Sequence, residues 1–302
     1  MIATPPAQTF SVALIGAGAM GGAIGARLLA MGSALRIFDL DPERISALVA
    51  EGGVGASSAA DAAQQTPYVI VSLNAAKIVE AAVFGPGGVA EGAAPGTLII
   101  DMSSIAPAAR RGLAARAQDA GLRWVDSPRS GGAPKAATGN LTLMAGGAPE
   151  DVAEARGVLS LVASNITHMG PAGAGQTTKL INQVLCGLNF LAVAEATQLA
   201  QDAGVAAAKL PSALAGGRAD SAILQEYMPR FAVKDYRRTG RIDNMVKDLA
   251  AVQDLARATH TAMPLTAVCA EVHRMLTAAG LGGEDQAALM EFFRGPDATL
   301  GR

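Results

Sequence analysis

The chain has 302 residues, of which 50% are hydrophobic and 17% are charged, with a formal net charge of -2. This length predicts about two domains, each with its own core. A charge near zero and few aromatic residues argue against a nucleic-acid partner, whose binding surface usually needs clustered basic residues. Cys186 and Cys269 lie in apolar helical contexts, so we expect buried thiols in a reducing compartment rather than a disulfide or a metal site.

The first predicted element is a strand over residues 12–15, which ends in glycines and passes into a helix over residues 22–31. This order of strand, tight turn and helix is typical of a dinucleotide-binding site. Gly16 permits the turn, Gly18 lets the backbone approach a diphosphate, and Gly21 lets the helix pack closely on the sheet. Because the glycine motif alone is weak, a turn in some other α/β protein is the alternative.

A second predicted strand, residues 35–38, ends at Asp39. An acidic side chain at this place can accept hydrogen bonds from both hydroxyls of an adenosine ribose. The same carboxylate would repel a 2′-phosphate, so the sequence favours NAD, with NADP less favoured. The alternative is a residue that only caps the helix beginning near Pro42.

The rest of the first half alternates apolar runs with helical patterns, which predicts successive parallel strands with helices between them. These strands are residues 68–73, 97–101 and 123–126. A further strand is predicted over residues 141–145 and a helix over residues 149–162. After residue 170 the pattern is helical to the end, with a long apolar segment over residues 180–199.

We therefore predict an α/β fold with two domains. Residues 1–169 would form an N-terminal Rossmann-type doubly wound sheet that binds a dinucleotide, and residues 170–302 an all-helical C-terminal domain for substrate binding and oligomerisation. Apolar stretches are interrupted before they reach the length needed to span a membrane, and no signal peptide precedes the first strand. We expect a cytoplasmic protein without a membrane partner.

Residues 173–183 read as a glycine turn that opens a helix. Lys179 and Asn182 are three positions apart in it, so their side chains share one helical face. The remainder of this helix is apolar, which places Lys179 at a partly buried boundary, where a lysine can exchange protons near neutral pH. The alternative is a lysine that reaches solvent from an amphipathic helix.

These motifs, in their order along residues 12–293, resemble those of the β-hydroxyacid dehydrogenases. Residues 16–21, with Ala19 and Met20 between the glycines, are similar to the cofactor turn of that family. Residues 101–107 are similar to its segment near the nicotinamide ribose, where Ser104 would contact the cofactor. Leu73 and Asn74 stand where the family usually has a proline-containing segment under the cofactor.

The same resemblance gives roles to residues further along the chain. In the family's substrate loop, Ser130, Gly131 and Gly132 would hold a substrate carboxylate. Lys179 would be the catalytic lysine and Asn182 the asparagine that orients the substrate. Lys247 would approach the cofactor from the second domain, although Lys247 with its neighbour Asp248 could also be a solvated helix pair.

Arg129 departs from the family pattern, which usually has a small apolar residue before the serine and two glycines. An arginine beside a carboxylate-binding loop could bind a second anionic group of the substrate through two hydrogen bonds. It could equally brace the loop through an internal ion pair. Both interpretations stay open at the level of sequence.

The resemblance implies an NAD-dependent oxidoreductase that interconverts a small 3-hydroxy acid and its semialdehyde or keto acid, with Lys179 as general acid and base. It also implies a homodimer or homotetramer. No pattern predicts a metal site. The alternatives are a non-catalytic dinucleotide-binding sensor or scaffold, and a reductase of another carbonyl or imine substrate on the same fold.

Overall fold

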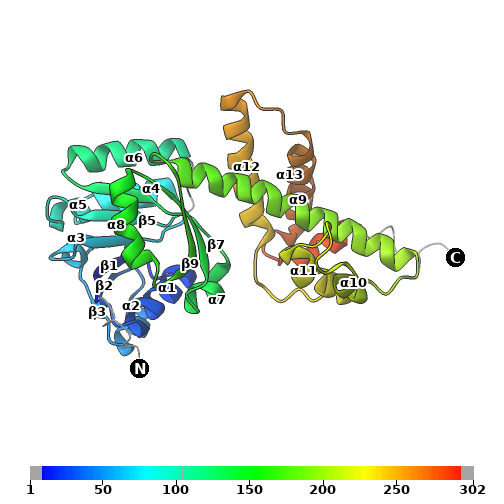
Figure 1. The fold of residues 1–302 in the computed structure, drawn as a ribbon, viewed down its shortest axis with the longest axis horizontal. Coiled ribbons are helices and arrows are strands. Elements are labelled where there is room, and N and C mark those ends of the chain that lie inside the picture. Colours follow the sequence, from blue (N-terminus) through cyan, green and yellow to red (C-terminus); the bar gives the residue numbers. More distant parts are fainter. Residues whose placement is uncertain (1–8, 104, 106, 294–302) are drawn as a thin grey trace. The chain divides into compact units, whose positions relative to one another are not determined.

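The computed structural model describes residues 9–103, 105 and 107–293. The chain divides into two compact units, Met1–Lys179 and Leu180–Arg302 (Figure 1). The helix α9 (Ala174–Asp202) is continuous across this division. The predicted domain boundary after residue 169 precedes that helix and stays a prediction.

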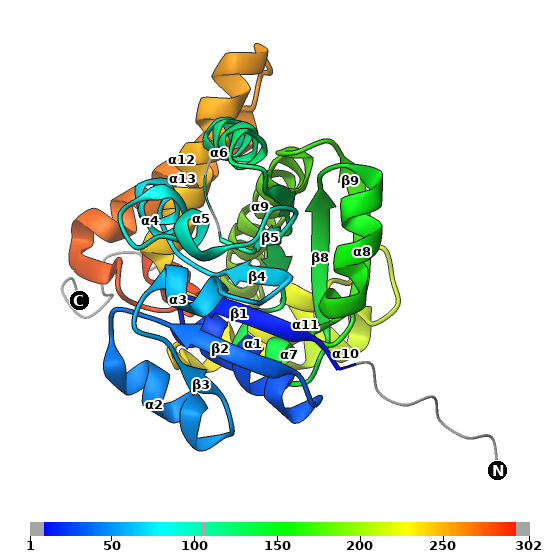
Figure 2. The ribbon, with the colours of Figure 1, turned by 90° about the vertical axis from the view of Figure 1, so that its left-hand side faces the viewer.

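A parallel sheet forms the centre of the first unit. Its strands are β1 (Ser11–Ile15), β2 (Ala34–Phe38), β3 (Val54–Gly55), β4 (Tyr68–Val71), β5 (Leu98–Asp101), β6 (Arg123–Asp126), β7 (Arg129–Ser130), β8 (Leu141–Gly146) and β9 (Ala163–Gly170). They lie in the order β3-β2-β1-β4-β5-β6-β8-β7, with β9 beside β8. Figure 2 shows the part from β3 to β5, and the neighbouring strands β8 and β9. From β3 to β6 every neighbouring pair is parallel. This arrangement confirms the predicted Rossmann-type fold.

Two details go beyond the sequence prediction. Strand β8, which was predicted without a direction, runs antiparallel to β6 and to β7. The strands β3, β7 and β9 were not predicted, because β3 and β7 have two residues each and β9 is mostly exposed without apolar alternation. A half-exposed strand at the end of a sheet carries little hydrophobic periodicity.

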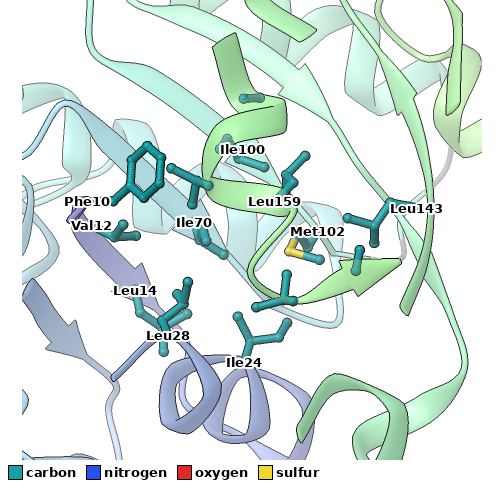
Figure 3. Packing of buried hydrophobic residues seen from close by; sticks show 14 of the residues in the cluster. Phe10, Val12, Leu14, Ile24, Leu28, Ile70, Ile100, Met102, Leu143 and Leu159 are labelled. Atoms are coloured by element: carbon teal, nitrogen blue, oxygen red, sulfur yellow. The ribbon is translucent and has the colours of Figure 1, made fainter. Parts of the chain in front are cut away.

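Helices cover the sheet because successive strand residues point to opposite faces. Those of the first unit are α1 (Ala19–Ala30), α2 (Pro42–Ala50), α3 (Ala59–Ala63), α4 (Ala76–Phe84), α5 (Val89–Gly92), α6 (Pro107–Asp119), α7 (Gly132–Ala137) and α8 (Pro149–Leu159). Val12 and Leu14 of β1 enter a core that includes Ile24 of α1 and Leu159 at the end of α8 (Figure 3). The alternate residues of β1, Ala13 and Ile15, pack in a second core with α3, α4 and α6.

The second unit is helical, as predicted. It contains the rest of α9, then α10 (Leu210–Leu214), α11 (Ala222–Val233), α12 (Ile242–Thr259) and α13 (Pro264–Leu276), with short helical segments η1 (Ala207–Lys209), η2 (Thr277–Leu281) and η3 (Gln286–Phe292). Phe190, Phe231 and Leu249 are buried in its core. Cys269 is buried there too, and burial raises the pKa of its thiol to about 11, so this thiol is protonated at neutral pH.

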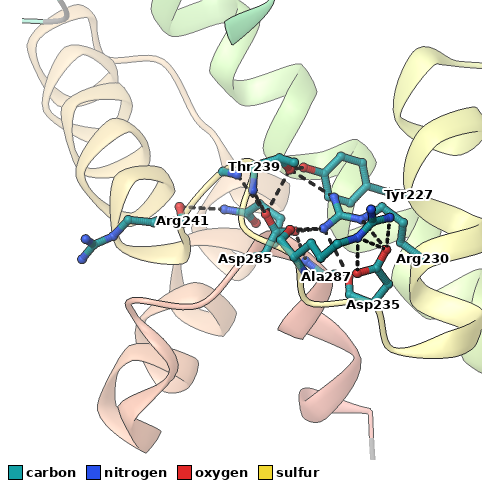
Figure 4. Close-up of polar contacts among 10 residues, drawn as sticks. Tyr227, Arg230, Asp235, Thr239, Arg241, Asp285 and Ala287 are labelled. Carbon is teal, nitrogen blue, oxygen red and sulfur yellow. Dashed lines mark hydrogen bonds and ion pairs between the residues drawn. The ribbon is translucent and has the colours of Figure 1, made fainter. Parts of the chain in front are cut away.

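A buried carboxylate joins the helices of this unit. Asp285 is fully buried and accepts hydrogen bonds from the backbone N–H groups of Thr239, Gly240 and Ala287 (Figure 4). Arg230 of α11 forms an ion pair with it at 2.9 Å. These contacts fix the loop before α12 to the segment that opens η3, so the polar network has a structural role.

Helix α9 corrects one expectation from the sequence. Among the described residues, it is a helix long and apolar enough to cross a membrane by length and composition, with a mean hydropathy of 1.3 over its most apolar window. The core helix of a water-soluble domain can meet the same criterion. Phe190 and Ala194 of α9 are in the core of the second unit, whereas Ile181 and Leu185 are exposed.

The histidines with described contacts have structural roles. His273 is buried, and its ring nitrogens contact the carbonyl of Cys269 and the side chain of Gln286. Burial lowers its pKa. His168 lies near the carbonyl oxygens of Gly147 and Gly170.

Candidate active site

The glycine turn after β1 has the geometry that the sequence predicted. Gly16 has a φ of +93°, and a Cβ atom there would lie 2.6 Å from the carbonyl oxygen of Ser72. A Cβ atom at Gly21 would lie 1.9 Å from the carbonyl oxygen of Gly16. Both glycines are therefore required by the protein's own packing, which brings α1 close to the turn.

Gly18 differs from its two neighbours in this motif. A Cβ atom there would meet only the Arg44 guanidinium, at 3.7 Å, and the backbone φ is -60°. The fold itself therefore tolerates a side chain at Gly18. The space in front of this residue matches what the backbone needs in order to approach a diphosphate.

Asp39 lies at the end of β2, beside the glycine turn. Its Oδ2 accepts a hydrogen bond of 2.7 Å from the Ala17 N–H, and its Oδ1 accepts one of 2.9 Å from the Asp41 N–H. The helix α2 is capped by Asp41, which accepts from the Glu43 N–H, so Asp39 is not the capping residue. This geometry disfavours the capping interpretation and leaves the Asp39 carboxylate at the cofactor turn.

A pocket of about 820 Å³ opens over these residues in the first unit. Its volume is in the range of sites that bind small molecules and cofactors. Nine of the residues proposed from sequence line it: Gly16, Gly18, Ala19, Met20, Gly21, Asp39, Leu73, Asn74 and Arg129. The lining therefore fits a dinucleotide, with glycine amides for the phosphates and a carboxylate for a ribose.

Sequence reasoning missed several residues of this pocket: Phe38, Leu40, Arg44, Ser58, Ile78 and residues 86–88. Most of them follow the carboxyl ends of β2, β3 and β4. Ligands of open α/β sheets bind at that edge, so the predicted strand ends were the signal that could have found them.

The loop of Leu73 is held from the neighbouring strand. The Leu73 N–H donates to the Ser103 hydroxyl at 3.0 Å, and the Ser103 N–H donates to Asp101 Oδ1 at 2.9 Å. Ser103 was not predicted as a site residue. It holds the backbone of Leu73, which is 30 positions away in the sequence, and the sequence pattern does not reveal such a contact. The predicted cofactor contact Ser104 lies outside the described residues.

Arg129 begins the predicted substrate loop and lies on β7. Its guanidinium donates a hydrogen bond to the Met102 carbonyl oxygen and also lines the pocket. Ser130 pairs with Thr142 in the sheet, and the two glycines after it have φ values of +125° and +71°. A chain reversal with such backbone angles favours glycine, so Gly131 and Gly132 shape this loop.

Asp126 holds the beginning of α9, which carries Lys179. This carboxylate is fully buried and accepts hydrogen bonds from the Gly173 N–H at 2.7 Å and the Gln176 N–H at 2.9 Å. A Cβ atom at Gly175 would lie 2.8 Å from Asp126 Oδ2. Lys179 is half-buried, in line with the predicted boundary position. Unlike the nine residues above, Lys179 is not among the residues that line the pocket.

Asn182 and Lys247 belong to the second unit. Asn182 Nδ2 donates to the Gln183 side chain at 2.9 Å and lies 3.4 Å from Cys186 Sγ. Gln183 donates to Asp248 on α12 at 2.7 Å, and the Lys247 ammonium lies 3.7 Å from the same carboxylate group. The pair Gln183 and Asp248 thus links the two helices that carry the predicted residues.

Two family models together match most of the chain. The NAD binding domain of 6-phosphogluconate dehydrogenase matches residues 11–170, and the NAD-binding domain of NADP-dependent 3-hydroxyisobutyrate dehydrogenase matches residues 173–293. The chain belongs to the β-hydroxyacid dehydrogenase family. It is therefore an oxidoreductase with NAD(P)-binding domains, which confirms the resemblance seen in the sequence.

Several relatives cover nearly the whole chain. An L-threonate dehydrogenase of Cupriavidus necator is 34% identical over 94% of this chain and 96% of its own length. An NAD-dependent L-serine dehydrogenase of Pseudomonas aeruginosa is 34% identical over 96% of this chain and 99% of its own. The 3-hydroxyisobutyrate dehydrogenase of Mycobacterium tuberculosis with L-serine has the same fold, with a TM-score of 0.87, 30% identity, and coverage of 95% of this chain and 100% of that one.

Proposed function

We propose that this chain is an NAD-dependent oxidoreductase that interconverts a small 3-hydroxy acid and its semialdehyde or keto acid. The observation that carries the proposal is the pocket, where open space in front of Gly18 lies beside a carboxylate, Asp39, held by two backbone amides. Amides at the start of α1 would bind the diphosphate and Asp39 the adenosine ribose. When bound, the nicotinamide would supply the hydride acceptor for the alcohol or the hydride donor for the carbonyl.

Lys179 carries the proton in this proposal. Its amine takes the proton of the substrate hydroxyl during oxidation and returns it to the carbonyl oxygen during reduction. In its protonated form it also stabilises the negative charge that grows on that oxygen. The two hydrogen bonds that Asp126 accepts from backbone N–H groups at the start of α9 support this role, because they fix the beginning of the helix that carries the lysine.

The remaining predicted residues hold the reactants. Ser130 and the amides of Gly131 and Gly132 bind the substrate carboxylate, and Asn182 orients the substrate. The other proposed cofactor contacts are Ala19, Met20, Leu73, Asn74, Ser104 and Lys247. In this proposal, these contacts would bring the reacting carbon to the nicotinamide and so lower the entropic cost of reaching the transition state.

The test is NADH formation at mildly alkaline pH across a panel of hydroxy acids. The panel contains 3-hydroxyisobutyrate, glycerate, serine, threonate, and hydroxy acids with a second anionic group; the relatives named for L-threonate and L-serine motivate two of these. We expect turnover of at least one member with NAD and much less with NADP. Binding of NADH without turnover of any member would favour a dinucleotide sensor.

Asp39→Asn should relax the preference for NAD. The change keeps the side-chain size but removes the charge that repels a 2′-phosphate and that accepts charge-assisted bonds from ribose hydroxyls. We expect the ratio of kcat/KM for NAD to that for NADP to fall about tenfold or more. Steady-state kinetics with both cofactors measure this ratio, and Asp119→Asn, an exposed acid at the end of α6, is the control. An unchanged ratio would remove Asp39 from the ribose site.

Arg129→Met tests the two interpretations of this arginine. Its side chain reaches the Met102 carbonyl and the pocket, so it can both brace β7 and meet a ligand. If it binds a second anionic group, KM for dianionic substrates should rise by about tenfold more than KM for monoanionic ones. Equal increases for both classes would assign Arg129 to bracing alone.

We also propose the setting in which this enzyme works. A small hydroxy acid is the expected partner, with no nucleic acid and no membrane involved. A reducing cytoplasm suits a chain whose cysteines, Cys186 and Cys269, are both free thiols. A homodimer or homotetramer is expected, and sedimentation or light scattering would give the number of subunits.

A further inference from the structure

Arg44 is the third residue of α2, and it lines the cofactor pocket. Its Nη1 is 3.6 Å from Asp39 Oδ1, and its Nε is 3.1 Å from Asp41 Oδ2. The side chain is 51% exposed, so it is only partly held by the protein. The guanidinium therefore sits next to the carboxylate that would select the cofactor, with part of its surface open to the pocket.

The glycine turn also lies next to the Arg44 guanidinium. The Arg44 Nη1 atom is the protein atom that a Cβ at Gly18 would meet, at 3.7 Å. The guanidinium thus lies between the Asp39 carboxylate and the open side of the glycine turn. These are the places where an adenosine ribose and its neighbouring diphosphate would bind.

The Asp39 carboxylate itself is constrained. Each of its oxygens accepts one backbone N–H, from Ala17 and from Asp41, and its side chain is only 9% exposed. It cannot turn away from a 2′-phosphate without breaking these bonds. Any tolerance of a phosphate at this end of the pocket must therefore come from a neighbouring cation, and Arg44 is placed to supply it.

We propose that Arg44 is a specificity-determining residue of the cofactor site. Its guanidinium partly neutralises Asp39 and offers planar donors to a phosphate on the adenosine ribose. The preference between NAD and NADP is then set by the pair Asp39 and Arg44, and not by Asp39 alone. This inference rests on the proposed function, because it assumes that the pocket binds a nicotinamide dinucleotide.

The simpler role for Arg44 is an exposed ion pair with Asp41 within the first turns of α2. Such pairs contribute little to stability and would leave cofactor choice unchanged. The two roles therefore differ in one measurable property. Because Arg44 and Asp39 are in contact, some coupling between them is expected in either case, but only a specificity role predicts that this coupling changes NADPH binding more than NADH binding.

The experiment is a double-mutant cycle read by direct binding. Dissociation constants of NADH and NADPH are measured by fluorescence titration for the wild type, Arg44→Gln, Asp39→Asn and the double variant. Arg44→Gln should weaken NADPH about tenfold or more and NADH about threefold or less. Asp39→Asn should strengthen NADPH binding, and that gain should disappear in the double variant.

A matched control is Arg116→Gln. Arg116 is on α6, is exposed to a similar degree, pairs with Glu80, and does not line the pocket. It should leave both dissociation constants unchanged. Arg44→Lys should fall between wild type and Arg44→Gln for NADPH, since a lysine keeps the charge but loses the paired donors.

Additive effects in the cycle, or equal losses for NADH and NADPH in Arg44→Gln, would overturn the role of Arg44. These outcomes are separate from failure of the proposed function. If the wild type binds neither nucleotide, the dinucleotide assignment itself is wrong. If the wild type binds NADH and the variant binds both nucleotides as well as the wild type does, only the inference about Arg44 is wrong.

Discussion

Lys179→Ala should lower kcat by a factor of about 10³ or more while the dissociation constant of NADH changes by less than about twofold. If the proposed function is right, the variant lacks both the group that would carry the proton and the positive charge that would stabilise the reacting oxygen. The Asp126 contacts to Gly173 and Gln176 involve only backbone N–H groups, so the start of α9 should keep its position. Stopped-flow hydride transfer and NADH titration on the same preparation measure the two quantities.

One further variant separates the role of the proton from the role of the charge, and a second serves as a control. Lys179→Arg keeps a positive charge but does not lose its proton near neutral pH, so oxidation of the alcohol should stay slow. Lys209→Ala, an exposed lysine of the second unit, should have wild-type kinetics. Turnover of Lys179→Ala within about tenfold of the wild type would assign the proton transfer to another group.

Asp285→Ala should destabilise the protein by about 3–5 kcal/mol, because it leaves a largely buried guanidinium without one of its carboxylate partners. It also leaves the N–H groups of Thr239, Gly240 and Ala287 without their acceptor (Figure 4). The side chain of Arg230 is 11% exposed and that of Asp285 is 0% exposed, so water cannot easily replace these bonds. Urea denaturation followed by circular dichroism gives the change in the free energy of unfolding.

The matched control is Asp254→Ala on α12. Asp254 also pairs with an arginine, Arg257, but its side chain is 72% exposed. Removing an exposed ion pair should leave the unfolding midpoint nearly unchanged. If both aspartate variants have the same midpoint as the wild type, the buried network does not stabilise the second unit.

The central part of the fold was predictable because its signals are local. The strand β1 alternates between two buried faces, the glycine turn follows it directly, and Asp39 ends the next strand. Such patterns can be recognised in a single sequence, because they depend on residues that are close together along the chain. Eight of the nine predicted pocket residues lie on these elements or directly after the end of a strand, and the ninth, Arg129, lies on β7.

The rest depended on contacts between distant segments. Strand β9 pairs with β8 but has an exposed, irregular pattern, so nothing in its sequence marks it as a strand. Arg44 resembles an ordinary surface arginine beside Asp41 in sequence, and only the fold places it against Asp39 and Gly18. Contacts between segments that are distant in the sequence could not be predicted from the spacing of residues along the chain.

The buried Asp126 carboxylate also makes three distant positions depend on one another during sequence change. A Cβ atom at Gly146 would lie 2.6 Å from Asp126 Oδ1, and one at Gly175 would lie 2.8 Å from Oδ2 and 2.2 Å from the Met144 carbonyl oxygen. Gly175 is inside α9, where alanine would ordinarily be the better helix former. Its glycine is therefore kept by two groups from earlier in the chain, the Met144 carbonyl oxygen, which is the closer, and the Asp126 carboxylate, which also accepts a hydrogen bond from the Gln176 N–H. A mutational path that enlarges Gly175 must therefore displace both the backbone of β8 and Asp126, and so must loosen the start of the helix that carries Lys179.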